Sequence, residues 1–394
     1  MRWRILALLF LARIGLGLQF QTMASVGDDL SVAFGFDWAG IGVLIGLFMA
    51  PGLVLALPAG YWGRFVTDRI MVAAGLGVLA LGGGLCALAA GPWSLGLGRV
   101  LGGVGFLFTT LYFTKMVADW FDGREIATAM SILVMSWPLG IAMGQLGHAW
   151  LAAQWGWRVP FLAASSYTLL AGLAVFWLYR PPAGLPAAQG GAAPSLSPME
   201  WRLILCAAGA WAAFNAAYVV YLSFGPQMLS HHGHSDLAAA GVISLASWLM
   251  IFSGAACGQL VDRFGRRSLV LTSCMVAAIA AVLLLGAPAG GPGGGLAASL
   301  LFGLVGMAPA GVIMALAGQA LRPETRAFGM GVFFTIYYAL MMVTPPVAGL
   351  LLDKTGAPEA PLWLAAGLFA LVVPLGFGFE LNKTARVRPA PGQA

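Results

Sequence analysis

Apolar runs of about 20 residues follow one another along the whole chain, and they limit what it can fold into. Of the 394 residues, 60% are hydrophobic and only 9% are charged, whereas a soluble domain carries about 25% charged residues. A helix needs roughly 20 mostly apolar residues to cross a bilayer. The sequence therefore predicts an all-α integral membrane protein that is surrounded by the lipid bilayer.

Twelve such runs are present, in two groups of six. We predict membrane-spanning helices at residues 4–26, 39–61, 70–90, 94–116, 126–149, 158–179, 201–224, 237–259, 269–288, 295–318, 328–352 and 361–380. The segment between the groups is rich in Pro, Ala, Gly and Ser, which is typical of a flexible linker. We therefore expect two pseudo-symmetric six-helix bundles, residues 1–180 and 201–394, joined by a cytoplasmic linker, residues 181–200.

The distribution of Lys and Arg predicts the orientation of these helices. With a cytoplasmic N-terminus, 16 of the 20 basic residues fall on the cytoplasmic side, Arg158 and Lys354 fall outside, and Arg13 and Arg99 lie within spans. Basic residues favour cytoplasmic loops. We expect a multi-pass protein of a bacterial-type plasma (inner) membrane with both termini in the cytoplasm. Because the charges do not form one basic stripe, nucleic acid is not an expected partner.

Two repeated features indicate an internal duplication. Residues 60–69 follow the second predicted helix and resemble residues 258–267, which follow the eighth, at an offset of 198 residues. Arg124 precedes the fifth helix and Arg326 precedes the eleventh, at an offset of 202 residues. A six-plus-six duplication is the layout of many secondary transporters.

The second of these segments resembles a known family. Gly258-x-x-x-Asp262-Arg263-x-Gly265-Arg266-Arg267 is similar to the signature of the major facilitator superfamily for the loop after the second helix of a half, and the first copy departs from it at Arg64 and Thr67. The resemblance implies two bundles that rock around a central cavity lined by the first and fourth helices of each half. It also implies gating roles for Asp68, Arg69, Arg124, Asp262, Arg263, Arg266 and Arg326.

Two further motifs extend the resemblance. Arg99-Val-Leu-Gly102-Gly103-Val-Gly105 is similar to the family's Arg-x-x-Gln-Gly-x-Gly signature, which implies a coupling or helix-pinning role for Arg99. The alternative is that Arg99 attracts anions at the mouth of the cavity. The segments that begin at Arg13 and Lys115 resemble the cyanate permease and 2-nitroimidazole transporter group, which implies a small anion or a small polar heterocycle as cargo.

Arg13 is the strongest candidate ligand for such a cargo. It lies about nine residues, or roughly 14 Å, into the first span, and no acidic residue lies at a comparable depth. A cation in the bilayer costs at least about 2.5–3.5 kcal/mol, and a guanidinium offers a rigid fork of donors to a carboxylate. Gly17, one turn away, is expected to leave room for a solute. The alternative is a structural arginine that bonds carbonyls and waters.

Polar and aromatic side chains on other spans are weaker candidates for the same site. Polar-tipped aromatics and amides in a bilayer need partners, which a cavity can supply. The alternative is that they form interhelical hydrogen bonds. The candidates besides Arg13 are Gln21, Thr110, Trp137, Asn215, Tyr218, Tyr221 and Tyr337.

The predicted function is secondary transport. Every acidic residue lies at a loop or at a predicted helix end, so a carboxylate proton relay inside the bilayer is not expected. We expect a monomeric, rocker-switch carrier for proton-linked uptake of a small organic or inorganic anion. The alternative is a proton-antiporting exporter, although Ser136-Trp137-Pro138-Leu-Gly140 is a poor match to the signature of such exporters. Without a nucleophile–base pair, a metal-ligand spacing or a phosphate-binding loop, we expect no enzyme activity, cofactor or metal.

Overall fold

The computed structural model describes residues 1–62, 66–121, 125–182, 195–287, 291–322 and 325–387. Within these residues, twelve helices are long and apolar enough to cross a membrane, and no strand is present. The predicted all-α class and the twelve spans are confirmed. The first half contains α1 (Arg2–Ser25), α2 (Gly27–Phe34), α3 (Trp38–Leu47), α4 (Ala50–Trp62), α5 (Asp68–Ala87), α6 (Pro92–Phe121), α7 (Ile126–Trp155) and α8 (Arg158–Leu178).

The second half contains α9 (Pro198–His231), α10 (Asp236–Phe264), α11 (Arg267–Gly286), α12 (Gly291–Leu301), the π-helix η2 (Phe302–Gly306), α13 (Ala310–Ala320), α14 (Arg326–Thr355) and α15 (Ala360–Val387). Two spans are interrupted, one between α3 and α4 and one around η2. A proline follows each interruption, Pro51 and Pro309, and proline removes a backbone donor from a helix.

Several helices extend beyond the predicted spans. α9 was expected at 201–224 and instead covers 34 residues, from Pro198 to His231, about 51 Å at 1.5 Å per residue. Its start is fixed by a capping box, because Ser197 accepts from the Glu200 N–H while the Glu200 carboxylate accepts from the Ser197 N–H. Hydropathy marks where a helix meets the bilayer, whereas capping and packing decide where it ends.

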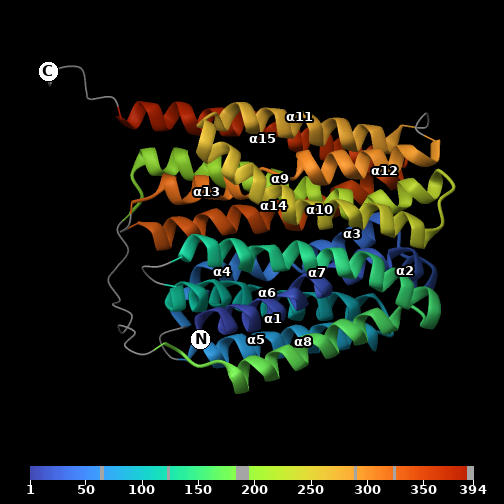
Figure 1. Ribbon diagram of the computed structural model, residues 1–394. Coiled ribbons are helices and arrows are strands. Elements are labelled where there is room, and N and C mark those ends of the chain that lie inside the picture. The colour runs from blue at the N-terminus through green and yellow to red at the C-terminus, as the bar shows by residue number, and fades with distance from the viewer. Residues whose placement is uncertain (63–65, 122–124, 183–194, 288–290, 323–324, 388–394) are drawn as a thin grey trace, which may run out of the picture.

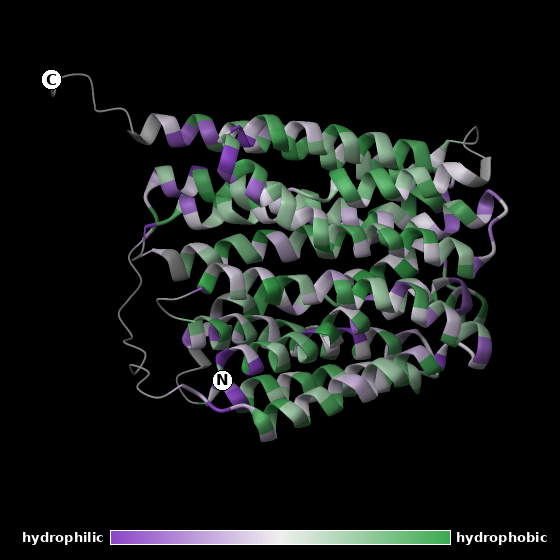
Figure 2. Ribbon diagram, in the orientation of Figure 1, coloured by the Kyte–Doolittle hydropathy of each residue, from purple (hydrophilic) through white to green (hydrophobic). Residues whose placement is uncertain are grey.

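The two halves lie side by side with their helices roughly parallel to one direction (Figure 1). We call the end that holds Met1, the start of α9 and the end of α15 the terminal face, and the other end the opposite face. Hydrophobic residues fill the length of the helices and hydrophilic ones gather toward both ends (Figure 2). Between the halves, α14 packs against α3 and α4, and α7 packs against α10.

Glycines bring the backbones of α3 and α14 into direct contact. A Cβ atom added at Gly42 would lie 2.3 Å from the carbonyl oxygen of Pro345, and one added at Gly349 would lie 2.0 Å from that of Trp38. No side chain larger than hydrogen fits at either position. Small residues permit such close approach in membrane proteins, where packing drives helix association. We call this contact the α3–α14 seam.

Candidate transport site

Arg13 projects from α1 and is bound to the backbone of α7. Its Nη1 donates to the carbonyl oxygen of Leu133 at 2.7 Å, to Ser136 Oγ at 3.1 Å and to the carbonyl oxygen of Val134 at 3.4 Å. Pro138 lies inside α7 and cannot donate to the carbonyl four residues earlier, that of Val134. The proline therefore leaves an acceptor in the helix that a neighbouring cation can use.

The Nε of Arg13 makes no such hydrogen bond. Its Nε is buried and has no hydrogen-bond partner, and no ion pair in the described part of the chain includes Arg13. The phenols of Tyr337 and Tyr338, from α14 of the other half, lie within electrostatic range of the guanidinium. Arg13 therefore lies between the two bundles, anchored at one nitrogen and unpaired at another.

The expected space beside Gly17 is filled by protein. A Cβ atom at Gly17 would lie 2.5 Å from the carbonyl oxygen of Trp137 and 2.8 Å from the backbone nitrogen of Ile141. The prediction that Gly17 leaves room for a solute was wrong, because the glycine lets α7 pack directly on α1 instead.

Aromatic rings lie one to two turns from Arg13 along α1, toward the opposite face. Phe20 packs on Trp137 with ring centroids 5.3 Å apart, and Trp137 packs on Phe106 of α6 at 5.1 Å. Thr110 lies one turn further along α6, and its buried Oγ1 has no hydrogen-bond partner. Two predicted substrate ligands, Trp137 and Thr110, therefore lie where α1, α6 and α7 meet.

The remaining predicted ligands are used in local contacts. Gln21 donates to Gln145 and to Ser25, and its buried Oε1 has no partner. Tyr337 packs on Tyr338 with centroids 5.1 Å apart and lies 6.4 Å from Trp211. Of these side chains, Tyr337 lies within electrostatic range of the Arg13 guanidinium, without a hydrogen bond to it.

The polar residues of α9 are held inside the second bundle. Asn215 donates to the carbonyl oxygen of Trp211 at 2.8 Å. The Tyr218 hydroxyl bonds Ser247 Oγ at 2.6 Å, and the Tyr221 hydroxyl bonds Ser299 Oγ at 2.8 Å. Serines of α10 and α12 therefore satisfy both hydroxyls, and no hydrogen bond within the described residues joins these groups to Arg13.

Arg99 is the second arginine within the bilayer region, and it is 2% exposed. Its Nε donates to the carbonyl oxygen of Leu44 at 2.9 Å and its Nη1 to that of Gln19 at 3.1 Å, while the guanidinium lies 4.4 Å from the ring centroid of Phe48. The Leu44 carbonyl is available because Phe48 ends α3 there. These contacts join α6 to α1 and α3.

Apart from Arg99, the predicted gating residues that the structure describes lie at the terminal face. Asp68 is paired with Lys115, which also contacts Asp119 at 3.2 Å. The guanidinium of Arg69 lies 5.1 Å from the ring centroid of Phe176. Three others are exposed around the end of α10, namely Asp262, Arg263 and Arg266. Arg124 lies outside the described residues, and Arg326 begins α14 with its side chain likewise outside them.

Two charge clusters at this face were not predicted. Arg267 contacts Glu380 at 3.2 Å and Gln319 at 3.0 Å. Glu200, which is fully buried, accepts from Arg322 Nε and Nη2, each at 3.0 Å. The Ser197-x-x-Glu200 pattern was a readable sign of the capping role of Glu200, but its pairing with a residue 122 positions away was not.

At the opposite face, a carboxylate joins the two halves. Asp353, near the end of α14, accepts from the backbone N–H of Trp38 at 3.1 Å and of Ala39 at 2.7 Å. These are the first two residues of α3, where backbone donors lack partners within the helix and the helix dipole favours a negative charge. The contact extends the α3–α14 seam to its outer end. No local sequence signal indicates it.

Comparisons with known proteins agree with this architecture. Residues 5–340 match the Major Facilitator Superfamily. The gallate transporter of Pseudomonas putida is 26% identical over 199 residues, which cover 50% of this chain and 44% of that protein, so the match spans less than half of its length. The 3-(3-hydroxy-phenyl)propionate transporter of Escherichia coli (strain K12) is 25% identical over 410 residues, covering 98% of this chain and 95% of that protein.

A solved structure shows the same fold. The crystal structure of a bacterial homolog of the human lysosomal transporter Spinster, in an inward-facing and unoccupied conformation, superimposes with a TM-score of 0.74 at 20% identity and covers 99% of both chains. The matched family region includes nearly all of the first half and most of the second. The chain therefore belongs to the Major Facilitator Superfamily and is a multi-pass membrane transporter rather than an enzyme.

Proposed function

We propose that this transporter takes up a small carboxylate anion that binds beside Arg13. The observation that carries the proposal is the buried Arg13 Nε, which no group of the described protein binds although it lies between the two bundles. An unsatisfied buried donor of a charged group costs more than about 1–3 kcal/mol. A solute carboxylate would remove this cost while it is bound. The aromatic rings of Phe20, Trp137 and Tyr337 suit a cargo with an apolar or aromatic body.

The names of the relatives favour the same chemical class. Gallate and 3-(3-hydroxy-phenyl)propionate, the cargoes named for the two relatives, are both aromatic carboxylates. The resemblance of the first half to the cyanate permease group adds smaller anions to the candidate cargoes. We propose that the chain is related to that group within the superfamily.

The proposed mechanism is rocker-switch alternating access. In this conformation the α3–α14 seam and the Asp353 contact join the halves at the opposite face. We take this as the state closed at that face. Opening there requires that Asp353 leave Trp38 and Ala39, and that the backbones around Gly42 separate.

The proposed function also includes coupling of uptake to protons and an orientation of the protein in the membrane. The acidic residues of the described spans lie toward helix ends, as Glu200, Asp262 and Asp353 do, so the proton is proposed to travel with the weak acid or with the anion that balances Arg13. We propose a cytoplasmic terminal face, a bacterial-type inner membrane, and a monomer as the transport unit. The bias of Lys and Arg toward the terminal face supports this orientation.

The test is uptake into proteoliposomes with a proton gradient directed inward. Gallate, 3-(3-hydroxyphenyl)propionate, cyanate and proline are compared as labelled solutes. Arg13→Gln is expected to reduce carboxylate uptake about 10- to 100-fold, which corresponds to the loss of a hydrogen bond to a charged group. Arg158→Gln is the matched control, because Arg158 is exposed at the opposite face, 4.3 Å from the Trp157 ring centroid.

Two results would overturn the proposal. Near-normal carboxylate uptake by Arg13→Gln, with Arg158→Gln also normal, would remove Arg13 from the binding site. Solute efflux in exchange for protons, with neutral or cationic compounds preferred, would instead establish the exporter.

A further inference from the structure

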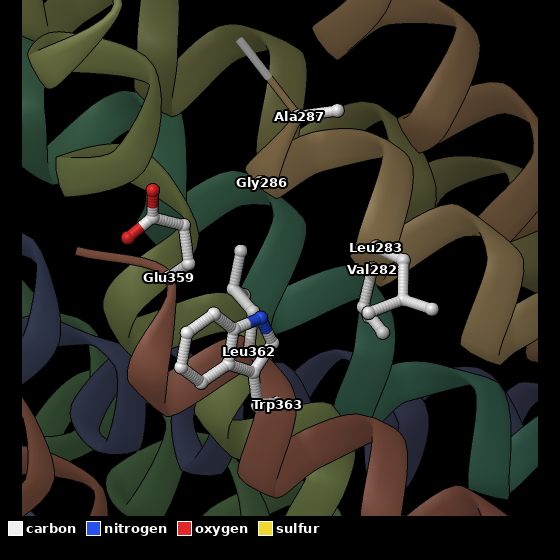
Figure 3. Close-up of a pocket in the computed structure, with 7 residues that line it drawn as sticks. All are labelled: Val282, Leu283, Gly286, Ala287, Glu359, Leu362 and Trp363. Carbon is white, nitrogen blue, oxygen red and sulfur yellow. The ribbon is translucent and has the colours of Figure 1, made fainter. Parts of the chain in front are cut away.

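A separate hollow opens on the second bundle at the opposite face. It lies where α11 ends and α15 begins, has a volume of about 270 Å³, and is lined by Val282, Leu283, Gly286, Glu359, Leu362 and Trp363 among others. Figure 3 shows Glu359, Trp363 and Val282 on different sides of it. None of its lining residues belongs to the proposed transport site.

The polar chemistry of the hollow favours a cation. Glu359 supplies the one charged side chain of the lining, which contains no Lys or Arg. Its carboxylate takes part in no ion pair or side-chain hydrogen bond within the described residues. The indole of Trp363 lines the same hollow and is 58% exposed. A carboxylate and an indole that line one hollow suit an ammonium group, which can donate to the first and lie over the second.

The position of the hollow favours a lipid over a free amine. Both α11 and α15 are membrane spans, so the end of one and the start of the other lie near the depth of the head groups. Tryptophan is enriched at this depth. Leu283, 47% exposed, and Trp363 continue the hollow as an apolar outer surface. A ligand here can place a polar group beside Glu359 and an acyl chain along that surface.

Gly286 keeps the hollow open. A Cβ atom there would lie 3.5 Å from Glu359 Cγ and 3.6 Å from Leu362 Cδ1, which is ordinary contact. A larger side chain at this last residue of α11 can therefore be accommodated by the backbone but would extend into the hollow. This offers a way to close the site without removing the charge.

We propose that this hollow binds a phospholipid whose head group ends in a primary ammonium, as in phosphatidylethanolamine. The ammonium donates to Glu359 and lies over Trp363, and one acyl chain follows Leu283 and the outer surface of α11. The site is independent of Arg13 and of the proposed cargo.

The experiment is native mass spectrometry of the full chain from nanodiscs that contain equal amounts of phosphatidylethanolamine, phosphatidylcholine and phosphatidylglycerol. The wild type is expected to retain phosphatidylethanolamine over the other two by about tenfold, the effect of one hydrogen bond to a charged group. Glu359→Gln and Gly286→Leu are both expected to abolish this preference, one by removing the charge and the other by filling the space. Asp29→Asn, an exposed acid at the same face of the first bundle, should leave it unchanged.

Equal retention of the three lipids by the wild type would overturn the proposal. So would equal retention of phosphatidylcholine and phosphatidylethanolamine, because a quaternary ammonium has no N–H to donate, and so would an undiminished preference in both variants.

Discussion

Asp37 and Asp353, which come from opposite halves of the protein, cap the same helix end. The Asp37 side chain accepts from the Gly40 N–H at 2.8 Å, and Asp353 accepts from the N–H groups of Trp38 and Ala39. Together they satisfy the donors at the start of α3. Asp37 moves with α3 whatever the two halves do, whereas the bonds of Asp353 exist only while the halves meet at the opposite face. One carboxylate therefore stabilises the helix and the other stabilises the closed state.

This difference predicts different phenotypes for the two similar substitutions Asp353→Ala and Asp37→Ala. Asp353→Ala should raise the ratio of open to closed protein at the opposite face about 10- to 100-fold, because it removes hydrogen bonds to a charged group worth about 1.5–3 kcal/mol. Asp37→Ala should lower thermal stability by about 1 kcal/mol, as loss of a cap does, without changing that ratio. Distances between spin labels at Leu88 and Leu284, both exposed at this face, measure the ratio. Identical distance distributions in the two variants would show that Asp353 does not hold the halves together.

The α3–α14 seam predicts a second way to prevent closure. Gly42→Ala places a Cβ atom 2.3 Å from the Pro345 carbonyl oxygen, and backbone atoms cannot rotate away as a side chain can. We expect the variant to fold, to stay open at the opposite face and to lose at least about 90% of uptake, since a 1.4 kcal/mol penalty already changes an equilibrium tenfold. Gly77→Ala is the control, because nothing lies within 4 Å of its added Cβ atom. Full uptake by Gly42→Ala would mean that transport does not require this seam.

The sequence predicted the twelve spans because bilayer thickness imposes a length and a hydropathy on each of them. It did not predict how the helices meet. Gly17 is equally compatible with a solute and with a neighbouring backbone, and the structure places α7 there. Tyr218 and Tyr221 needed hydrogen-bond partners, but that these are Ser247 and Ser299 depends on helix packing.

For the acidic residues at helix ends, too, the sequence did not predict the contacts between helices. Their positions outside the apolar runs were readable, whereas their partners were not, because the partners lie far away in the chain. Glu200 is bound by Arg322, and Asp353 by the start of α3.

The candidate site is predictable only in part, because its partners also lie far away in the chain. Arg13 stands out as a charge in an apolar run, but the acceptors that hold it arise from a proline-interrupted helix more than 100 residues away.

Glu200 should be important for the stability of the second bundle. Its buried carboxylate accepts from Arg322 at Nε, Nη2 and the backbone, and from Thr325 Oγ1 at 2.6 Å. Breaking a buried ion pair costs about 3–5 kcal/mol, and because the Arg322 side chain is 47% exposed we expect about 2–3 kcal/mol for Glu200→Gln. Thermal unfolding in detergent measures the effect. Glu380→Gln is the control, since the Glu380 side chain is 33% exposed and is joined to Arg267 by one hydrogen bond. An equal fall in both variants would contradict this expectation.

Two acidic side chains from different halves face one another across the opposite face. Asp28 of α2 and Asp236 of α10 both line a small cavity of about 50 Å³ between the halves. Burial, followed by the charges of Asp236 and Asp29, raises the pKa of Asp28 above its ordinary value. In the closed state Asp28 therefore binds a proton more tightly than a freely hydrated carboxyl group does.

The direction of the resulting pH dependence follows from linkage. A raised carboxyl pKa means that the closed state holds more protons than the open one, so its stability falls as the pH rises through the pKa of Asp28 and recovers as the pH falls. We expect the Leu88–Leu284 distances to shift toward the closed population between pH 7.5 and pH 4.5, roughly the range above the ordinary carboxyl pKa. Asp28→Asn should be largely closed at both pH values, because it removes permanently both the charge that burial disfavours and its repulsion from Asp236. Asp29→Asn should retain part of the pH response, since burial and Asp236 contribute more than Asp29 to the Asp28 shift, while the pKa of Asp29 is itself raised by burial and by Asp236. A pH response that is unchanged in Asp28→Asn would show that the charge of Asp28 does not govern closure.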